Sequence, residues 1–464
     1  MRTADVVVIG GSAAGIPAAM TSRRHYPNKS VLLIRKEPQV LVPCGIPYIF
    51  GAIGSYEADL IPDATLQKSG IDLLVAEVTG IDREQQAVTT ATGEQVGYDR
   101  LVLAVGSQPI VPAIPGVEKE GIFAIRKDVP YIERMLAALD RARDLVIVGC
   151  GFIGVELAEE CRRNRDVNIT LVEMLPHCLE QNYDPEFSLQ AEEIMKAEGL
   201  HVAGAQRVAA FVGDTHVEGV RLADGRTLKA DMVVLAIGAA ANSELAQKAG
   251  LATGVTGGIQ VNRYMQTSDE RIFACGDCTE KVSFFDGKPT RLKLASIATM
   301  EARIAGANLF SVRRANQGVI GVYSTILSDT AFAAAGLTER AAREMGYHLM
   351  VGEAEGLNRH PGCMPGAANL KVKLVFEAGT GVILGGQISG ATSAGELINA
   401  ISACINQRMT ADDIATFQAG THPGLTASPI SYQLVNAAEV ALAAARKESA
   451  VLEAALAVPE SAPA

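Results

Sequence analysis

Cys44 stands in a short stretch of sequence that could support thiol chemistry. It is the only cysteine in the first 149 residues, and Gly45 and Pro47 follow it in the run VPCGIPYIFG. Because proline suits the first turn of a helix, this run predicts a helix that starts beside the cysteine. The positive end of a helix dipole favours the thiolate, which is the nucleophilic form of cysteine. A cysteine that only packs in a core fits the same run, so this stretch alone leaves both interpretations open.

Two glycine-rich turns could hold the phosphates of nucleotides. Residues 5–15 read DVVVIGGSAAG and residues 145–156 read LVIVGCGFIGVE, so each turn joins an apolar strand to the start of a helix. Glycines let the backbone approach a pyrophosphate, and the N-terminus of a helix adds amide groups and a positive dipole. A second apolar strand follows each turn, at residues 31–37 and 169–175. This context predicts two dinucleotide sites and therefore two cofactors, one of which passes electrons to the other.

The residue at the end of the second strand differs between the two sites. Glu173 ends this strand in the second site. A carboxylate there accepts hydrogen bonds from both ribose hydroxyls and repels a 2′-phosphate, so we expect NADH to be preferred over NADPH. In the first site Arg35 takes this place, Glu37 comes two residues later, and Ser12 replaces the middle glycine. The sequence therefore leaves open how the adenosine ribose is held in the first site.

The two turns belong to an internal repeat. Residues 1–110 and 140–242 show the same order of strand, glycine turn, helix and strand. A repeat of this length indicates two copies of the βαβ dinucleotide-binding unit. Residues 257–280 add a strand and a turn that contains Asp277, a carboxylate suited to the ribityl hydroxyls of a flavin. From about residue 323 the alternation of residues predicts a two-stranded ribbon with helices around it.

Composition argues against several classes of protein. The chain has 464 residues, a net charge of −11 and a pI of about 5.3, which argue against nucleic acid as a partner. No apolar run approaches the roughly 18 residues that span a bilayer, so we expect no membrane contact. The first residues run straight into a strand, so we expect no signal peptide. The eight cysteines are scattered, which favours the reducing cytoplasm.

Cys275 and Cys278 have the spacing of a redox pair or of half a zinc site. The turn between them already has an explanation as a flavin-binding turn, and no second pair with this spacing completes a zinc site. We therefore predict no metal site and give a redox role little weight, and the role of the pair, structural or otherwise, stays open.

The motifs GGSAAG, CGIPY, LAVGSQP, GCGFIGVE and IFACGDC stand in the order found in the flavoprotein disulfide reductases that bind FAD and NAD. Over about residues 4–440 the chain resembles their single-cysteine branch, which contains coenzyme A disulfide reductases, persulfide reductases and NADH oxidases. Ile49 stands where glutathione-reductase-like members carry a second cysteine, and Ala13 where peroxidase members carry a histidine. No sulfur-transfer sequence follows residue 464, so we expect no C-terminal rhodanese domain.

The resemblance implies an α/β fold with two Rossmann-like domains, one for FAD and one for NAD, and an α+β C-terminal domain that forms a homodimer. The implied limits are residues 1–112 and 241–322 for the FAD-binding domain, 113–240 for the NAD-binding domain, 323–448 for the dimerisation domain and 449–464 for a flexible tail.

The resemblance also implies which residues contact the two cofactors. For FAD they are Gly10, Gly11, Ser12, Ala13, Ala14, Gly15, Arg35, Lys36, Pro43, Gly45, Val78, Ala104, Val105, Gly106, Ser107, Asp277, Ala295 and Ala298. For NAD they are Gly149, Gly151, Phe152, Ile153, Gly154, Glu156, Glu173, Ile237 and Gly238.

Cys363 and His422 are the C-terminal residues to which the resemblance gives a part in catalysis, from the neighbouring subunit. Coenzyme A disulfide reductases carry a Tyr-Tyr-Pro-Gly run with one tyrosine that reaches the partner's cysteine, and here the run begins with Cys363 and Met364. His422-Pro423 is similar to the His-Pro of the two-cysteine reductases, whose histidine is the acid and base. A packing cysteine and a capping or core histidine are the alternatives.

The resemblance implies that hydride passes from NADH to FAD and that two electrons then reach the sulfur on Cys44. We therefore predict an NADH oxidoreductase that reduces a small-molecule disulfide, persulfide or polysulfide, with binding of coenzyme A left open. The alternative is an NADH oxidase that uses oxygen. An NADH-sensing flavoprotein that binds partners and a reductase of a carrier protein are further alternatives, and neither needs a thiolate at Cys44.

Overall fold

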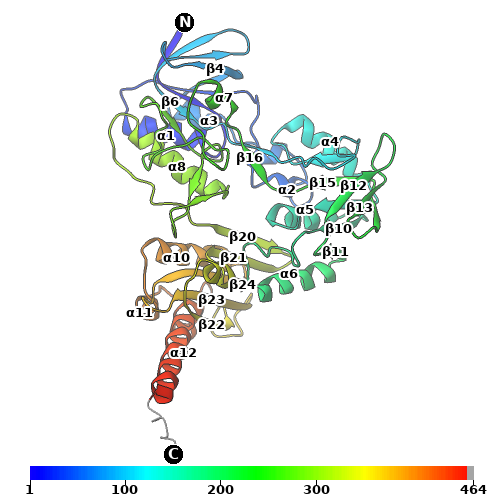
Figure 1. The fold of residues 1–464 in the computed structure, drawn as a ribbon, viewed down its shortest axis with the longest axis vertical. Helices are drawn as coiled ribbons and strands as arrows, with labels where there is room; N and C mark the ends of the chain where they lie inside the picture. The colour runs from blue at the N-terminus through cyan, green and yellow to red at the C-terminus, as the bar shows by residue number, and fades with distance from the viewer. Residues whose placement is uncertain (457–464) are drawn as a thin grey trace, which may run out of the picture. The chain divides into compact units, whose positions relative to one another are not determined.

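The structure is a computed structural model that describes residues 1–456, with side chains up to residue 447. The chain divides into two compact units, whose elements are labelled in Figure 1. The first unit contains Met1–Met174 and Leu200–Val319, and the second contains Leu175–Gly199 and the chain from Ile320 on. None of the helices in the described part of the chain has the length and apolar character of a bilayer-spanning segment.

The first glycine turn lies at the edge of a sheet with strand order β3-β2-β1-β6-β5-β4, to which β17 adds beside β6. Strands β1, β2, β3, β6 and β17 are parallel, and the antiparallel hairpin β4–β5 adds to β6 through β5. Small residues of α1 and α8 pack on this sheet in one apolar core. The strands are β1 (Arg2–Ile9), β2 (Val31–Arg35), β3 (Asp72–Val75), β4 (Val78–Asp82), β5 (Ala87–Thr90), β6 (Gln95–Leu103) and β17 (Ile272–Ala274). The helices are α1 (Gly15–His25), α2 (Ile46–Ile49), α3 (Ala64–Lys68), α7 (Glu244–Lys248) and α8 (Ala295–Asn308).

The second glycine turn lies in a parallel sheet with strand order β11-β10-β9-β15-β8, so the predicted repeat of the βαβ unit is confirmed. A small antiparallel sheet, β12-β13-β14, covers part of it. The strands are β8 (Ile122–Ala124), β9 (Asp144–Val148), β10 (Asn168–Val172), β11 (Leu200–Ala203), β12 (Val208–Val212), β13 (Gly219–Leu222), β14 (Thr227–Lys229) and β15 (Met232–Leu235). The helices are α4 (Val129–Leu139) and α5 (Phe152–Arg162), and β7 (Ser107–Pro109) pairs with β16 (Ala239–Ala241).

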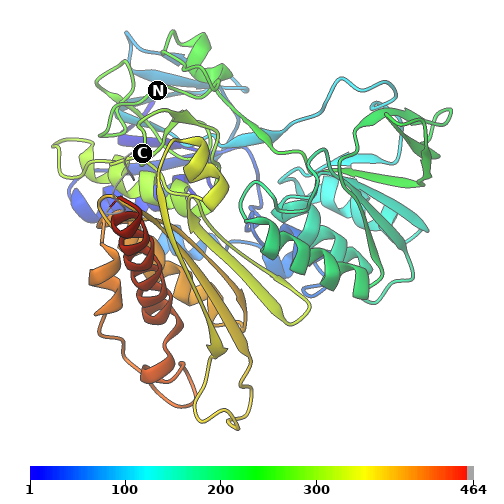
Figure 2. The ribbon, with the colours of Figure 1, turned by 60° about the horizontal axis from the view of Figure 1, so that its bottom comes forward.

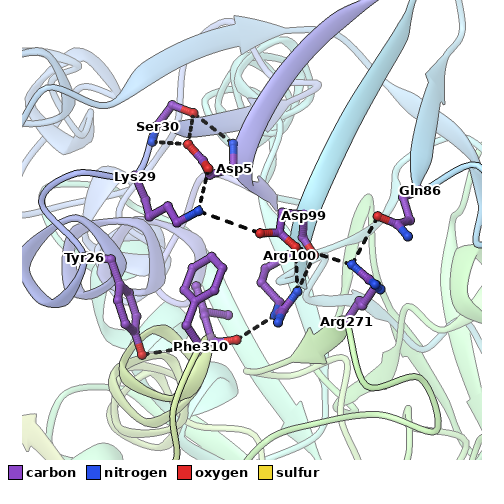
Figure 3. Close-up of polar contacts among 10 residues, drawn as sticks. Asp5, Tyr26, Lys29, Ser30, Gln86, Asp99, Arg100, Arg271 and Phe310 are labelled. Atoms are coloured by element: carbon purple, nitrogen blue, oxygen red, sulfur yellow. Dashed lines mark hydrogen bonds and ion pairs between the residues drawn. The ribbon is translucent and has the colours of Figure 1, made fainter.

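A cluster of charged and aromatic side chains joins the segment after α8 to the first sheet (Figure 3). Phe310, just after α8, lies between the cations of Lys29 and Arg100, each 4.9 Å from its ring centre. The ring of Tyr26 meets it edge-on, and Arg100 donates a hydrogen bond of 2.7 Å to the carbonyl of Leu309. Cation–π contacts of this kind stabilise a surface modestly, and here they hold the segment after α8 against the first sheet.

The second unit is built on an antiparallel sheet with strand order β20-β21-β24-β23-β22. The predicted ribbon is its β23–β24 pair, but β20, β21 and β22 extend it to five strands. Helix α12 lies along β22 (Figure 2), where a Cβ at Gly352 would come 1.9 Å from the carbonyl oxygen of Ala437. The strands are β20 (Val322–Leu327), β21 (Thr330–Gly336), β22 (Leu349–Leu357), β23 (Asn369–Glu377) and β24 (Ile383–Gly390). The helices are α6 (Pro185–Ala197), α9 (Glu339–Glu344), α10 (Ala394–Asn406), α11 (Ala411–Ala415) and α12 (Gln433–Leu456).

Two of the expected domain limits differ from the structure. Leu175–Gly199 lies inside the expected NAD-binding domain yet packs with the second unit. There the buried Lys373 of β23 pairs with Asp184 at 3.0 Å and Glu186 at 2.6 Å, at the start of α6. Helix α12 continues to Leu456, so the expected tail begins inside a helix, and residues 457–464 lie outside the described residues.

Candidate active site

The first glycine turn has the tight shape that a pyrophosphate site needs. Gly10 has a φ of 112°, and a Cβ there would come 2.2 Å from the carbonyl oxygen of Ala104. A Cβ at Gly15 would come 1.8 Å from the carbonyl oxygen of Gly10, so α1 starts directly against the strand. The hydroxyl of Ser12 is buried and has no hydrogen-bond partner among the described residues. A phosphate oxygen would satisfy it, so this turn fits the pyrophosphate of FAD.

The second turn repeats this geometry. Gly149 has a φ of 104°, and a Cβ there would come 2.5 Å from the carbonyl oxygen of Ala236. A Cβ at Gly154 would come 2.1 Å from the carbonyl oxygen of Gly149. Gly151 precedes α5, and the space where its Cβ would stand has no protein atom within 4 Å. The turn therefore leaves open the side from which a pyrophosphate would approach the start of α5.

Glu173 and Arg35, which stand at the ends of the two second strands, make different contacts. Glu173 accepts a hydrogen bond of 2.8 Å from the backbone of Cys150, so its carboxylate lies on the second glycine turn. Arg35 is buried, and its guanidinium donates to both oxygens of Asp63 at 2.6 and 3.0 Å and to two backbone carbonyls. A Cβ at Gly11 would come 2.6 Å from the Cδ of Arg35. Arg35 therefore supports the first turn and holds Asp63, and the exposed side chain at this strand end is that of Lys36.

Cys44 lies two residues before α2, whose N-cap is Gly45 and whose first turn contains Pro47, so the predicted helix start is confirmed. Cys44 is exposed and is not in a disulfide. Partial burial of the thiol nevertheless raises the pKa of Cys44, the Glu156 carboxylate raises it further, and Lys127 lowers it. The expectation that the helix start favours the thiolate is therefore wrong for the chain's own residues. The four residues of α2 form one turn, whose weak dipole does not outweigh burial and a nearby carboxylate.

Helix α5 joins the second glycine turn to the segment that follows Cys44. The buried Glu160 accepts a hydrogen bond of 2.5 Å from the backbone of Ala52, and Arg165 donates to the carbonyl of Phe50. One turn before Glu160, Glu156 acts on Tyr48 of α2, whose pKa rises to about 12 mainly because of burial. Helix α5 therefore starts at the second glycine turn and packs against the segment that follows Cys44.

Asp277 lies where the sequence analysis expected it. A Cβ at Gly276 would come 2.7 Å from the Cβ of Ala14 and 3.5 Å from that of Ala298, so this turn lies against the starts of α1 and α8. Ser107 donates a hydrogen bond of 2.8 Å to one oxygen of Asp277. Four of the predicted FAD residues are thus brought to one place beside the first glycine turn.

A buried ion pair under this turn escaped the sequence analysis. Lys281 and Glu301 pair at 2.8 Å, and their side chains are 2% and 1% exposed. Glu301 accepts a hydrogen bond of 2.9 Å from the backbone of Gly276, and Lys281 donates to the carbonyl of the same residue. The pair fixes the turn that carries Asp277. A lysine and a glutamate twenty residues apart give no signal in sequence, because their burial follows from the packing of α8.

Cys275 and Cys278 are buried thiols with structural contacts. The sulfur of Cys278 lies 3.5 Å from the carbonyl oxygen of Leu103 and 3.3 Å from that of Cys275. Burial raises the pKa of Cys278 to about 11 and that of Cys275 well above its usual value. Buried thiols of this kind are poor nucleophiles, which supports the structural interpretation of the pair.

Cys363 and His422 lie on two neighbouring loops of the second unit. A Cβ at Gly424 would come 3.7 Å from both the His422 ring and the methyl group of Met364. Both Cys363 and His422 are exposed, so His422 is not a core histidine. Its Nδ1 accepts a hydrogen bond of 3.2 Å from Gly424, which gives it a local structural contact. A second histidine that the sequence analysis did not single out, His360, contacts the carbonyl of Thr426 at 3.1 Å and ties the two loops together.

Comparison with known proteins places this arrangement in a family. Residues 4–302 match the pyridine nucleotide-disulphide oxidoreductases, and residues 322–429 match the dimerisation domain of these enzymes. The chain belongs to the pyridine nucleotide-disulphide oxidoreductase family. It is an oxidoreductase that uses FAD and NAD(H), which confirms the fold class and the cofactors expected from the sequence.

Relatives and solved structures carry related names. An NADH oxidase of Methanocaldococcus jannaschii is 31% identical over 89% of this chain and 93% of its own length. A CoA-dependent NAD(P)H sulfur oxidoreductase of Pyrococcus furiosus is 32% identical over 89% and 94%. The NAD-dependent persulfide reductase of A. fulgidus has a TM-score of 0.88 and 31% identity, and the match covers 96% of this chain and 84% of that one.

Proposed function

We propose that the enzyme reduces a small-molecule disulfide, persulfide or polysulfide with electrons from NADH, by way of Cys44. The observation that carries the proposal is the position of this exposed thiol, beside the start of α2 and near enough to Asp277 and to Glu156 of α5 that both carboxylates raise its pKa. The other cysteines of the first unit are buried, so Cys44 has no partner thiol in that unit. The persulfide and sulfur reductases among the relatives support the same class of acceptor.

Different residues of the chain would hold the two cofactors and react with the substrate. Glu173 and the second glycine turn would hold NADH, and the first turn with Ser12 and Asp277 would hold FAD. FAD, when bound, carries two electrons from NADH to the sulfur on Cys44. The Cys44 thiolate attacks the next disulfide and releases one thiol, and the mixed disulfide on Cys44 is then reduced. The balance is one disulfide, one NADH and one proton to two thiols and NAD⁺.

Lys127 is the cation that favours the attacking thiolate. It lowers the pKa of Cys44 while burial and Glu156 raise it. The thiolate therefore depends on this lysine and on the cofactor, because the chain alone favours the thiol. Replacement of Lys127 by Met should slow alkylation of Cys44 at neutral pH.

We further infer a homodimer in which Cys363 and His422 of one subunit complete the Cys44 site of the other. Their neighbouring, exposed loops and the match to a dimerisation domain support this arrangement. His422 would protonate the departing thiolate near neutral pH, and Cys363 would be a resolving thiol. Cys44→Ser and His422→Ala chains, refolded together, should regain one working site per mixed dimer. Full activity of His422→Ala alone, or no recovery in proven mixed dimers, would refute the shared site.

An NADH oxidase that uses oxygen is the second candidate. The relatives of that name and the water-forming NADH oxidase of Lactobacillus brevis, with a TM-score of 0.87 and 25% identity over 97% of this chain and 100% of that one, favour it. NADH oxidation with CoA disulfide, CoA persulfide, polysulfide and oxygen, measured side by side, separates the two. We expect a sulfur acceptor to be reduced at least about tenfold faster than oxygen, a difference of about 1.4 kcal/mol in barrier. The reverse order would establish the oxidase.

The expected cytoplasmic location stays a prediction. Every cysteine of the described chain is a free thiol, which supports a reducing compartment.

A further inference from the structure

Asp59 is a buried acid directly behind the backbone that follows Cys44. It ends the short turn η1 (Glu57–Asp59) and is 4% exposed. Its carbonyl oxygen accepts a hydrogen bond of 2.9 Å from the backbone of Val42, which fixes it beside the segment that leads to the thiol. A Cβ at Gly45 would come 1.7 Å from Oδ1 of Asp59. The carboxyl therefore rests against the residue that follows Cys44, and only glycine fits there.

This carboxyl has no partner that would offset a negative charge. Its Oδ2 is buried without a hydrogen-bond partner among the described residues. Among the described residues, no lysine, arginine or histidine forms an ion pair with Asp59. A buried carboxylate without a cation is less stable than the neutral acid. Burial accordingly raises the pKa of Asp59 to about 6.

We propose that Asp59 is a further group of the thiol site, a positioning acid whose protonation is coupled to that of Cys44, so that the Cys44 thiolate is favoured while Asp59 holds its proton and disfavoured once Asp59 has lost it. The proposal rests on the proposed function only in naming Cys44 as the reacting thiol. When Asp59 releases its proton to water, the new negative charge opposes a second negative charge on the neighbouring sulfur. Asp59 is an acid near the thiol that the sequence analysis did not single out.

Other charged groups act on the same sulfur from the elements around it. Glu156 on α5 and Asp277 raise the pKa of the thiol, and Lys127 lowers it. Tyr48 on α2 stays neutral, because burial and then Glu156 raise its pKa to about 12. Asp59 differs from these groups because its carboxyl is closed off from solvent and one of its oxygens has no partner.

Alkylation of Cys44 by iodoacetamide tests the proposal in the FAD-bound enzyme without turnover. The rate is followed by mass spectrometry from about pH 5 to about pH 9 in the wild type, Asp59→Asn and Glu57→Gln. Asparagine has the shape and the charge of the protonated acid, so Asp59→Asn should react at least about threefold faster at about pH 8. Glu57→Gln removes one charge from the exposed end of the same turn and should leave the rate unchanged.

Equal rates in the wild type and Asp59→Asn would overturn the proposal, as would an equal gain in Glu57→Gln. The wild type gives a second measurement that needs no variant. Its rate should rise less steeply with pH above about pH 6 than one independent thiol requires, and a single steady rise would also overturn the proposal. The outcome does not depend on the acceptor. If sulfur reduction survives in Cys44→Ser, the proposed function fails while the alkylation profile still decides the part of Asp59.

Discussion

The two glycine turns share one backbone design and differ in the side chain at the neighbouring strand end. In both turns the first glycine has a positive φ, and a Cβ at the last glycine would collide with the carbonyl of the first. Glu173 lies on the second turn, bonded to its backbone. Arg35 is buried under the first turn and bonded to Asp63. The comparison teaches that the shape of each turn depends on its backbone and its glycines, so the strand-end side chain can make different contacts in each copy.

The surroundings of the two turns also differ. The half of the repeat with the first turn carries a thiol, Cys44, with a buried acid behind the residue that follows it, whereas the half with the second turn carries helix α5, whose Glu156 raises the pKa of that thiol and whose Glu160 bonds to the backbone of Ala52. The repeated pattern therefore provides two similar turns, and the residues around the thiol lie outside that pattern.

The largest expected effect tests whether the thiol in the half of the repeat with the first glycine turn carries the sulfur chemistry. Cys44→Ser should lower turnover with sulfur acceptors at least about 10³-fold, because a hydroxyl is a far weaker nucleophile at neutral pH. FAD content and stopped-flow reduction of the flavin by NADH should stay as in the wild type, since both glycine turns are intact. Wild-type rates with sulfur acceptors would give Cys44 a structural role.

A matched pair of glycine variants tests whether the two turns serve different cofactors. Gly15→Ala would place a Cβ 1.8 Å from a carbonyl oxygen and should reduce bound FAD about tenfold or more. Gly154→Ala meets a carbonyl at 2.1 Å and should keep FAD but weaken NADH binding to a similar degree. FAD absorbance and NADH titration measure the two separately. Loss of FAD in Gly154→Ala with an intact fold would show that the turns are not independent.

Replacement of Glu173 sharpens the contrast between the strand ends. The wild type should prefer NADH over NADPH by about 1–3 kcal/mol, which is about 5- to 150-fold in kcat/KM. Glu173→Gln should lose most of this preference, because the neutral side chain no longer repels a 2′-phosphate. Glu37→Gln, near the first glycine turn, should leave the preference unchanged. Similar efficiencies with both nucleotides in the wild type would mean that Glu173 does not face the ribose.

The smallest expected effect compares the same chemical change, removal of a carboxylate charge, at Asp59 behind Gly45 and at Glu173 on the second glycine turn. The pKa of Asp59 is about 6 in the folded protein and 3.8 in the unfolded chain. The contribution of this group to the free energy of unfolding is therefore complete below about pH 3.8 and is lost as the pH rises through 6. Asp59→Asn should therefore raise the free energy of unfolding at about pH 8 by about 1–2 kcal/mol and leave it nearly unchanged at about pH 4. Glu173→Gln should lower it slightly, because a charged hydrogen bond to Cys150 becomes neutral. Urea unfolding at both pH values measures the signs, and a loss of stability in Asp59→Asn at about pH 8 would contradict the assignment.

The sequence by itself determined the features that depend on neighbouring residues. Glycine spacing between a strand and a helix predicted both dinucleotide turns, because tight backbone geometry needs particular residues at fixed offsets. The order of the same motifs indicated the family, the cofactors and the thiol at Cys44. Glu173 could be assigned to the second turn for the same reason, since the strand end lies beside the turn in every βαβ unit.

Tertiary structure alone decided the features that depend on burial and on contacts distant in sequence. Arg35 meets Asp63, Lys281 meets Glu301, and Asp59 lies behind Gly45 because separate segments pack together, which no local pattern records. The same packing reversed the expected pKa shift of Cys44, since desolvation and an approaching carboxylate act through space and outweigh one helical turn.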